Sequence, residues 1–141
     1  MADVNDISEV LPEEDVSFLK DKHPNHVVRQ VGSEIHVLLK DFAFPEQYSP
    51  RVSDLLLRLP AGYPNAAPDM FWTKPDVKLT AGVWPAQCAH REIPGSGSGC
   101  EVYESLSWQR WSRHFQGGWI VGVHGLQFFV RTVAQELKRG V

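Results

Sequence analysis

The chain has 141 residues, of which 43% are hydrophobic and 11% aromatic, enough apolar material for one domain with a buried core. Its formal net charge is -3, so no general positive field is available to hold the phosphates of a nucleic acid, and we expect no nucleic acid partner. The acidic N-terminus contains no apolar run, and no segment approaches the roughly 18 apolar residues of a membrane span. These features predict a cytoplasmic protein without membrane contact.

Domain organisation is simple. Residues 1–11 are polar and acidic with little periodicity, which predicts a flexible N-terminal segment followed by a single domain over 12–141. The chain has two cysteines, Cys88 and Cys100, and no secretion signal, so free thiols are expected rather than a disulfide. A reduced thiol can serve as a nucleophile.

The first predicted element is a helix over residues 12–21. Pro12 suits a first helical turn, and the acidic residues 13–15 place negative charge at the positive end of the helix dipole. The tripeptide His-Pro-Asn at residues 23–25 ends the helix, because the residue before a proline avoids the helical region.

Strand-like runs follow the helix. Two of them, at residues 26–31 and 34–42, are separated by a glycine-serine pair, a connection typical of a two-residue β-hairpin. A third run, at residues 54–59, places leucines on one face in strict alternation, and residues 70–73 form a fourth. Together these runs predict an antiparallel meander of four strands.

Periodicity fades from residue 74 to residue 118, where the glycine- and serine-rich stretch 94–99 has the composition of a flexible loop. A long irregular region inside a small domain often carries function. Helical spacing of apolar residues returns over about 123–139, starting with Val123. The sequence therefore predicts an α+β fold, with a four-stranded antiparallel meander, an N-terminal helix and a C-terminal helix.

One segment in mid-chain carries most of the functional signal. Residues 59–73 read Leu-Pro-Ala-Gly-Tyr-Pro-Asn-Ala-Ala-Pro-Asp-Met-Phe-Trp-Thr. Its prolines fix the backbone, and Tyr63 can pack its ring while its hydroxyl finds a backbone partner. The Leu-Pro, Tyr-Pro and Phe-x-Thr pattern, which here follows the third strand, resembles the signature of ubiquitin-conjugating enzymes and their non-catalytic relatives.

A second motif, Trp-Gln-Arg-Trp-Ser-Arg-His at residues 108–114, narrows the resemblance. Together with residues 68–72 it resembles the prokaryotic ubiquitin-conjugating-enzyme-like family E, over about residues 12–139. This resemblance implies a ubiquitin-conjugating-enzyme-like fold and no cofactor. The residues that carry the two motifs are Tyr63, Pro64, Pro68, Phe71, Trp108 and Trp111.

The resemblance also implies an activity and partners. The expected enzyme accepts the C-terminus of a ubiquitin-like protein from an adenylating activating enzyme, as a thioester or ester, and transfers it to a target amine. A JAB-type peptidase is expected in the same pathway. The alternative is a non-catalytic module of the same fold that binds a ubiquitin-like protein.

Acyl transfer requires a nucleophile, and the reactive thiolate of cysteine suits this role. In the family the cysteine lies a short distance before a tryptophan, and Cys100 has a similar spacing to Trp108. Cys100 is therefore the first candidate. Cys88 is the alternative, because it lies about as far beyond Thr73 as the family cysteine lies beyond its own threonine.

Two departures from the family pattern leave the mechanism open. The family's His-Pro-Asn tripeptide, thought to steady the oxyanion, is expected after Thr73, where residues 74–76 read Lys-Pro-Asp. The matching letters at residues 23–25 precede the first strand and are not this motif. Ser112 with His114 as its base could instead form an oxyester, and His114 or a backbone amide could stabilise the oxyanion.

Metal binding is not predicted. Cys88, His90, Cys100 and His114 have the donor atoms of a zinc site, but their spacing fits no compact ligand pair. His36 in a predicted strand and His124 near the last helix are predicted to be structural.

Overall fold

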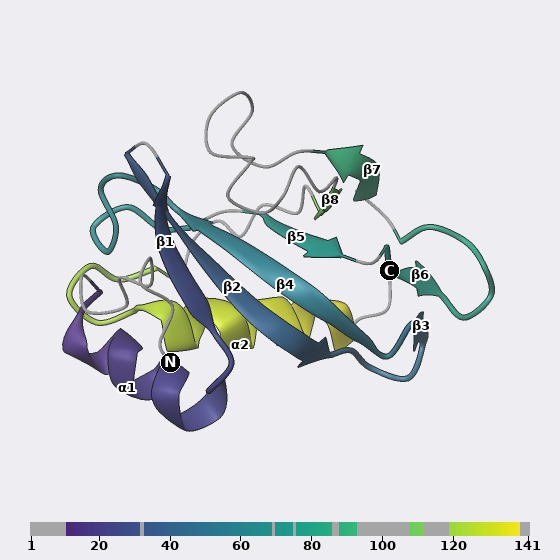
Figure 1. Ribbon diagram of the computed structural model, residues 1–141, viewed down its shortest axis with the longest axis horizontal. Helices are drawn as coiled ribbons and strands as arrows, with labels where there is room; N and C mark the ends of the chain where they lie inside the picture. The colour runs from purple at the N-terminus through teal and green to yellow at the C-terminus, as the bar shows by residue number, and fades with distance from the viewer. Residues whose placement is uncertain are drawn as a thin grey trace.

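The computed structural model describes residues 11–31, 33–68, 70–74, 76–85, 88–92, 108–111 and 119–138. Figure 1 shows the arrangement of the helices and strands. Neither helix in this part of the chain has the length and apolar character needed to cross a bilayer. The elements in chain order are α1 (Glu13–Lys22), β1 (Val27–Val31), β2 (Glu34–Ala43), β3 (Tyr48–Ser49), β4 (Val52–Leu59), β5 (Phe71–Lys74), β6 (Lys78–Leu79), β7 (Cys88–Glu92), β8 (Trp108–Trp111) and α2 (Leu126–Lys138).

Six strands form one antiparallel sheet in the order β1-β2-β4-β5-β8-β7, while β3 and β6 form a separate pair. Strands β1, β2, β4 and β5 are the predicted meander, and β8 and β7 extend it. Figure 1 shows α2 lying across one face of this sheet, with α1 near the start of α2. The predicted α+β fold is therefore confirmed.

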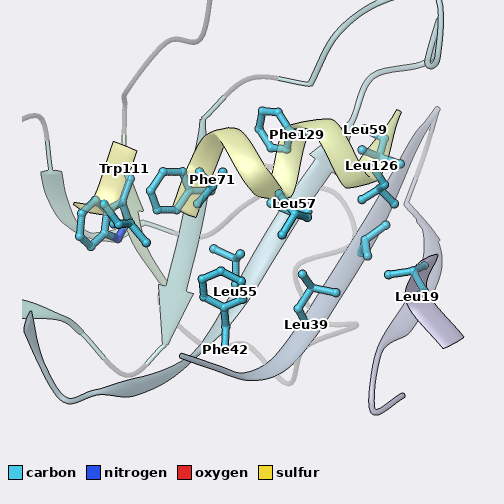
Figure 2. Close-up of a cluster of buried hydrophobic side chains, with 14 of the residues drawn as sticks. Leu19, Leu39, Phe42, Leu55, Leu57, Leu59, Phe71, Trp111, Leu126 and Phe129 are labelled. Carbon is cyan, nitrogen blue, oxygen red and sulfur yellow. The ribbon is translucent and has the colours of Figure 1, made fainter. Parts of the chain in front are cut away.

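The main hydrophobic core lies between the sheet and α2. Because successive side chains of a strand point to opposite faces, β2 and β4 each place every second residue against the helix. In Figure 2, Trp111 and Phe71 lie at one end of this core and Leu19 of α1 lies at the other. The core residues labelled there are Leu19, Leu39, Phe42, Leu55, Leu57, Leu59, Phe71, Trp111, Leu126 and Phe129.

The opposite face of the sheet also carries a buried cluster, which is smaller than the main core. A second cluster is formed by Leu38, Leu56, Trp72 and Trp108. Arg58 covers it, with its guanidinium carbon 5.0 Å from the centre of the Trp72 ring. The Arg58 guanidinium donates two hydrogen bonds of 2.9 Å to Glu34, which hold the arginine in place over the tryptophan.

His36 provides a pH-dependent test of this face. Its side chain is fully buried, with Nε2 3.2 Å from Glu34 Oε1. Burial, aided by the charge of Arg58 and opposed by Glu34, holds the pKa of His36 below the ordinary 6.5. Since the folded pKa lies below the unfolded value, the stability that the neutral ring provides is present above pH 6.5 and is lost as the pH falls further.

We therefore expect the urea midpoint of unfolding to fall on acidification from about pH 8 to about pH 5. In His36→Gln this pH dependence is expected to be weaker, because glutamine does not ionise. A variant that keeps the full wild-type pH dependence would show that His36 is not responsible.

Some strands were not predicted. β3 and β6 have only two residues each, and the sequences of β7 and β8 lack the alternation of apolar and polar residues that reveals a strand. Three of them lie within residues 74–118, which the sequence predicted to be irregular. The predicted flexible loop 94–99 and residues 1–10 lie outside the described residues.

The C-terminal helix begins at Leu126, so the predicted start near Val123 was wrong. Val123 is 68% exposed and lies in a turn that contains Gly122, whose φ is 83°. The carboxylate of Asp15 accepts a hydrogen bond from the Leu126 amide at 3.0 Å. The start of α2 is therefore set by a side-chain cap from α1. The residues next to Leu126 in the sequence give no sign of this cap.

Candidate functional site

Of the predicted nucleophiles, Cys88 is the one that lies in a described strand. Cys88 is the first residue of β7 and is the register partner of Trp111, the last residue of β8. Directly opposed residues of antiparallel strands have Cα atoms about 4.5–5.5 Å apart. Ser112 and His114 follow Trp111 in the chain and lie outside the described residues. The backbone of Cys88 is therefore close to that of Trp111, the residue that precedes Ser112.

Cys100 belongs to the segment that joins β7 to β8, which also lies outside the described residues. That segment follows Glu92, and it ends where Trp108 begins β8. Glu92 and Trp108 are register partners at the end of the strand pair opposite to Cys88 and Trp111. Cys88 thus lies at one end of the β7–β8 pair, and the segment that contains Cys100 begins and ends at the opposite end.

The described residues also contain no candidate metal site. Over the part of the chain that the structure describes, no three His, Cys, Asp or Glu side chains lie close enough together to hold a metal ion. His90 is in β7, but its side chain and that of Cys88 are not among the described features.

A buried polar network occupies the centre of this region. Gln109 in β8 is 0% exposed, and its Oε1 accepts hydrogen bonds from the Thr73 hydroxyl at 2.8 Å and the Val77 amide at 2.6 Å. Its Nε2 donates to the Val77 carbonyl at 2.8 Å, and Trp111 Nε1 donates to Thr73 Oγ1 at 2.9 Å. These four hydrogen bonds join β5, β8 and the chain that follows β5 into one unit.

Aromatic packing holds the far end of β8. The Trp111 ring stacks on Phe71 with centroids 5.1 Å apart and planes inclined by 20°. Phe44 and Tyr48 lie against the same ring at 6.2 and 6.0 Å. Trp111 is fully buried, so the last residue of β8 is fixed both by its packing and by the hydrogen bond to Thr73.

The segment after Thr73 is where the family resemblance implies an oxyanion-stabilising asparagine. Asp76 is half-buried there, and Val77 is fully buried with both its backbone groups bound by Gln109. Sequence reasoning missed Gln109. The available signal was a lone amide side chain between two motif tryptophans, at a position where a strand puts alternate residues into the core.

Tyr63 of the first motif takes part in a different junction. Its hydroxyl donates to Asp15 Oδ2 at 2.5 Å and also makes a hydrogen bond with the backbone of Leu126, so a carboxylate joins the predicted backbone partner. Burial, together with the hydrogen bond to Asp15 and its negative charge, raises the pKa of Tyr63 well above its ordinary value, which keeps the phenol protonated. Asp15 is 4% exposed and also caps Leu126, so one carboxylate joins α1, the Tyr-Pro turn and α2.

Gly125 leaves the space that this junction needs. A Cβ atom at this position would lie 2.7 Å from Asp15 Oδ1, closer than van der Waals contact permits. The absence of a side chain at Gly125 therefore lets the Asp15 carboxylate reach the first turn of α2.

The turn before α2 is anchored by aromatic side chains. Trp119 Nε1 donates to the Pro64 carbonyl at 3.0 Å. His124 Nδ1 accepts a hydrogen bond from the Ile120 amide at 2.8 Å, and its ring stacks on Phe128 with centroids 3.8 Å apart. His124 thus has the structural contacts predicted for it, while Trp119 holds the turn on the Tyr-Pro segment.

Three apolar side chains of this turn point to solvent. Ile120, Val121 and Val123 are 55%, 57% and 68% exposed. A hollow of about 350 Å³ lies beside Val123, with Glu14 and Arg131 in its lining. Apolar side chains clustered on an ordered surface segment are typical of a protein contact surface.

Comparison with known proteins identifies the family. A model of the family described as Prokaryotic E2 family E matches residues 11–140, a range that contains both sequence motifs and every described helix and strand. No curated protein and no solved structure matches the chain. The predicted resemblance is confirmed: the chain belongs to the Prokaryotic E2 family E, one of the prokaryotic families related to the ubiquitin-conjugating enzymes.

Proposed function

We propose that the protein carries the C-terminus of a ubiquitin-like protein as a thioester or ester and transfers it to a target amine. Membership in an E2-like family carries this proposal, since it implies ubiquitin-like conjugation with a ubiquitin-like protein and an activating enzyme as partners. The position of the candidate nucleophiles supports it. All of them lie in β7, between β7 and β8, or directly after β8.

The proposed reaction has two acyl-transfer steps. The thiolate attacks the thioester carbonyl that links the modifier to the activating enzyme; a new C–S bond forms, the old one breaks and the activating enzyme's thiol is released. The target amine then attacks the same carbonyl, an amide forms, the thiolate leaves and a base takes the amine proton. Each step passes through an oxyanion that a hydrogen-bond donor must stabilise.

Cys100 is the proposed nucleophile, on the strength of its spacing to Trp108. Cys88 is the alternative thiol, and Ser112 with His114 as base is the alternative for an oxyester. A cytoplasmic location and removal of the modifier by a JAB-type peptidase belong to the same proposal. The exposed turn at Ile120–Val123 is the surface that we expect a partner protein to cover.

Intact-mass measurement after incubation with the activating enzyme, the modifier and ATP tests the chemistry. We expect an adduct of one modifier that both thiol and hydroxylamine remove. It should disappear in Cys100→Ala and persist in Cys88→Ala, the matched control. An unchanged adduct in Cys100→Ala refutes this nucleophile, and a thiol-resistant adduct lost in Ser112→Ala assigns the serine.

The Lys-Pro-Asp sequence at 74–76 favours a second candidate function, a non-catalytic module that binds a ubiquitin-like protein. Without the asparagine of the family tripeptide, one recognised oxyanion donor is missing. Modifier binding that survives alanine at Cys88, Cys100 and Ser112 together, with no adduct formed by the wild-type protein, would establish this function instead.

A further inference from the structure

The Gln109 network has only one consistent orientation. Oε1 faces two donors, the Thr73 hydroxyl and the Val77 amide, while Nε2 faces one acceptor, the Val77 carbonyl. A flipped amide would set its NH₂ group against the Val77 amide and its oxygen against the Val77 carbonyl, so those hydrogen bonds would be lost. The side chain is therefore fixed in rotation as well as in position.

The Gln109 network extends the contact between β5 and β8 beyond their last backbone pair. Backbone pairing of β5 with β8 runs from Phe71 opposite Trp111 to Thr73 opposite Gln109. Past that pair, the side-chain amide of Gln109 binds both the N–H and the C=O of Val77, as the N–H and C=O of an opposed residue in an antiparallel strand would. Gln109 thus restrains the chain after β5 at a point that backbone pairing with β8 does not reach.

The buried amide of Gln109 fixes the alignment of β8 with the chain after β5. Apolar side chains would fill the same space without the need to satisfy buried polar groups, but they would tolerate small shifts of one backbone past the other. Hydrogen bonds to both groups of Val77 allow a single alignment. The restrained parts are the segment with Asp76 and the strand β8, whose last residue Trp111 lies opposite Cys88.

We propose that Gln109 is a positioning residue for acyl transfer. Through Thr73 and Val77 it holds the backbone after β5 at a fixed place relative to the end of β8 and the opposing start of β7. This inference rests on the proposed function. It assigns a task to a residue that touches neither the modifier nor the target, and it does not depend on which candidate is the nucleophile.

Kinetics of adduct formation by the full-length protein test the proposal. Gln109→Glu keeps an acceptor for Thr73 and the Val77 amide but loses the donor to the Val77 carbonyl. Thr73→Val keeps the branched shape of the side chain and removes the hydroxyl that links Trp111 to Gln109. In both variants we expect the maximal rate of modifier transfer to fall about 10- to 100-fold, with an unchanged KM for the modifier-charged activating enzyme.

Two further variants separate positioning from general stability. Thr73→Ser restores the hydroxyl and is expected to recover most of the rate that Thr73→Val loses. Leu19→Ala removes buried volume from α1, at the other end of the core from Trp111 in Figure 2, and should leave the transfer rate unchanged while lowering the unfolding midpoint. All variants are assayed at a temperature at which circular dichroism shows them folded.

The possible results are distinct. Wild-type transfer rates in Gln109→Glu and Thr73→Val overturn the positioning role, as does a rate loss that follows stability alone and also appears in Leu19→Ala. A wild-type protein that never forms an adduct refutes the proposed function itself. A wild-type adduct with unaffected Gln109 variants refutes only this inference.

Discussion

Replacement of Asp15 by alanine is expected to lower the free energy of unfolding by about 3 kcal/mol. Loss of the N-terminal cap of α2 accounts for about 1 kcal/mol of this, and the partly buried Tyr63 hydroxyl loses its carboxylate acceptor at a cost of about 1–3 kcal/mol. The carboxylate is 4% exposed and contacts both partners directly, so water does not replace it freely. Urea unfolding monitored by circular dichroism measures the change.

Glu14→Ala is the matched control, because Glu14 is the neighbouring carboxylate in the same first turn of α1 and its side chain is exposed. Its effect should stay within about 0.5 kcal/mol. Asp15→Asn should fall between the two, since it keeps an acceptor for the Leu126 amide. Equal losses in Glu14→Ala and Asp15→Ala would mean that charge in the first turn of α1, and not the junction, sets the stability.

Trp111→Ala is expected to destabilise the protein by about 4 kcal/mol, the usual cost of removing a fully buried large aromatic side chain. The variant loses the stack on Phe71, the contacts with Phe44 and Tyr48, and the hydrogen bond to Thr73. Urea unfolding of the full-length protein checks this value.

Trp111→Phe is the control for that prediction. It keeps an aromatic ring against Phe71 but cannot donate to Thr73, so it should cost about 1–2 kcal/mol in hydrogen bonding in addition to a smaller loss of packing. If the alanine and phenylalanine variants were equally unstable, the hydrogen bond and not the ring stack would be the main contribution of Trp111.

The elements that the sequence predicted correctly are those with strong local signals. α1 ends at Lys22 because the following His-Pro pair disfavours helix, and β1 and β2 flank the predicted glycine-serine connection. The alternating leucines of β4 likewise revealed the face that lies under α2. Each of these signals lies within one element or its immediate flanks.

The features that the sequence did not reveal depend on distant residues. The strands β7 and β8 are short and are stabilised by pairing with one another and with β5. The start of α2 is set by Asp15, and the Gln109 network joins residues more than thirty positions apart in the sequence. Of the candidate site, the two motifs were predicted and their residues Thr73 and Trp111 do meet, whereas the nucleophile stays a prediction.

The hydrogen bond between Asp15 and Leu126 closes a loop of 111 positions, one of the longest that this chain can form. Closing so long a loop early would cost chain entropy before many other contacts could offset it, so this junction belongs to the late steps of folding. Its loss should therefore leave the folding rate almost unchanged and appear in the unfolding rate, where about 3 kcal/mol corresponds to more than about a hundredfold acceleration. The Asp15 junction thus acts chiefly on the lifetime of the native state.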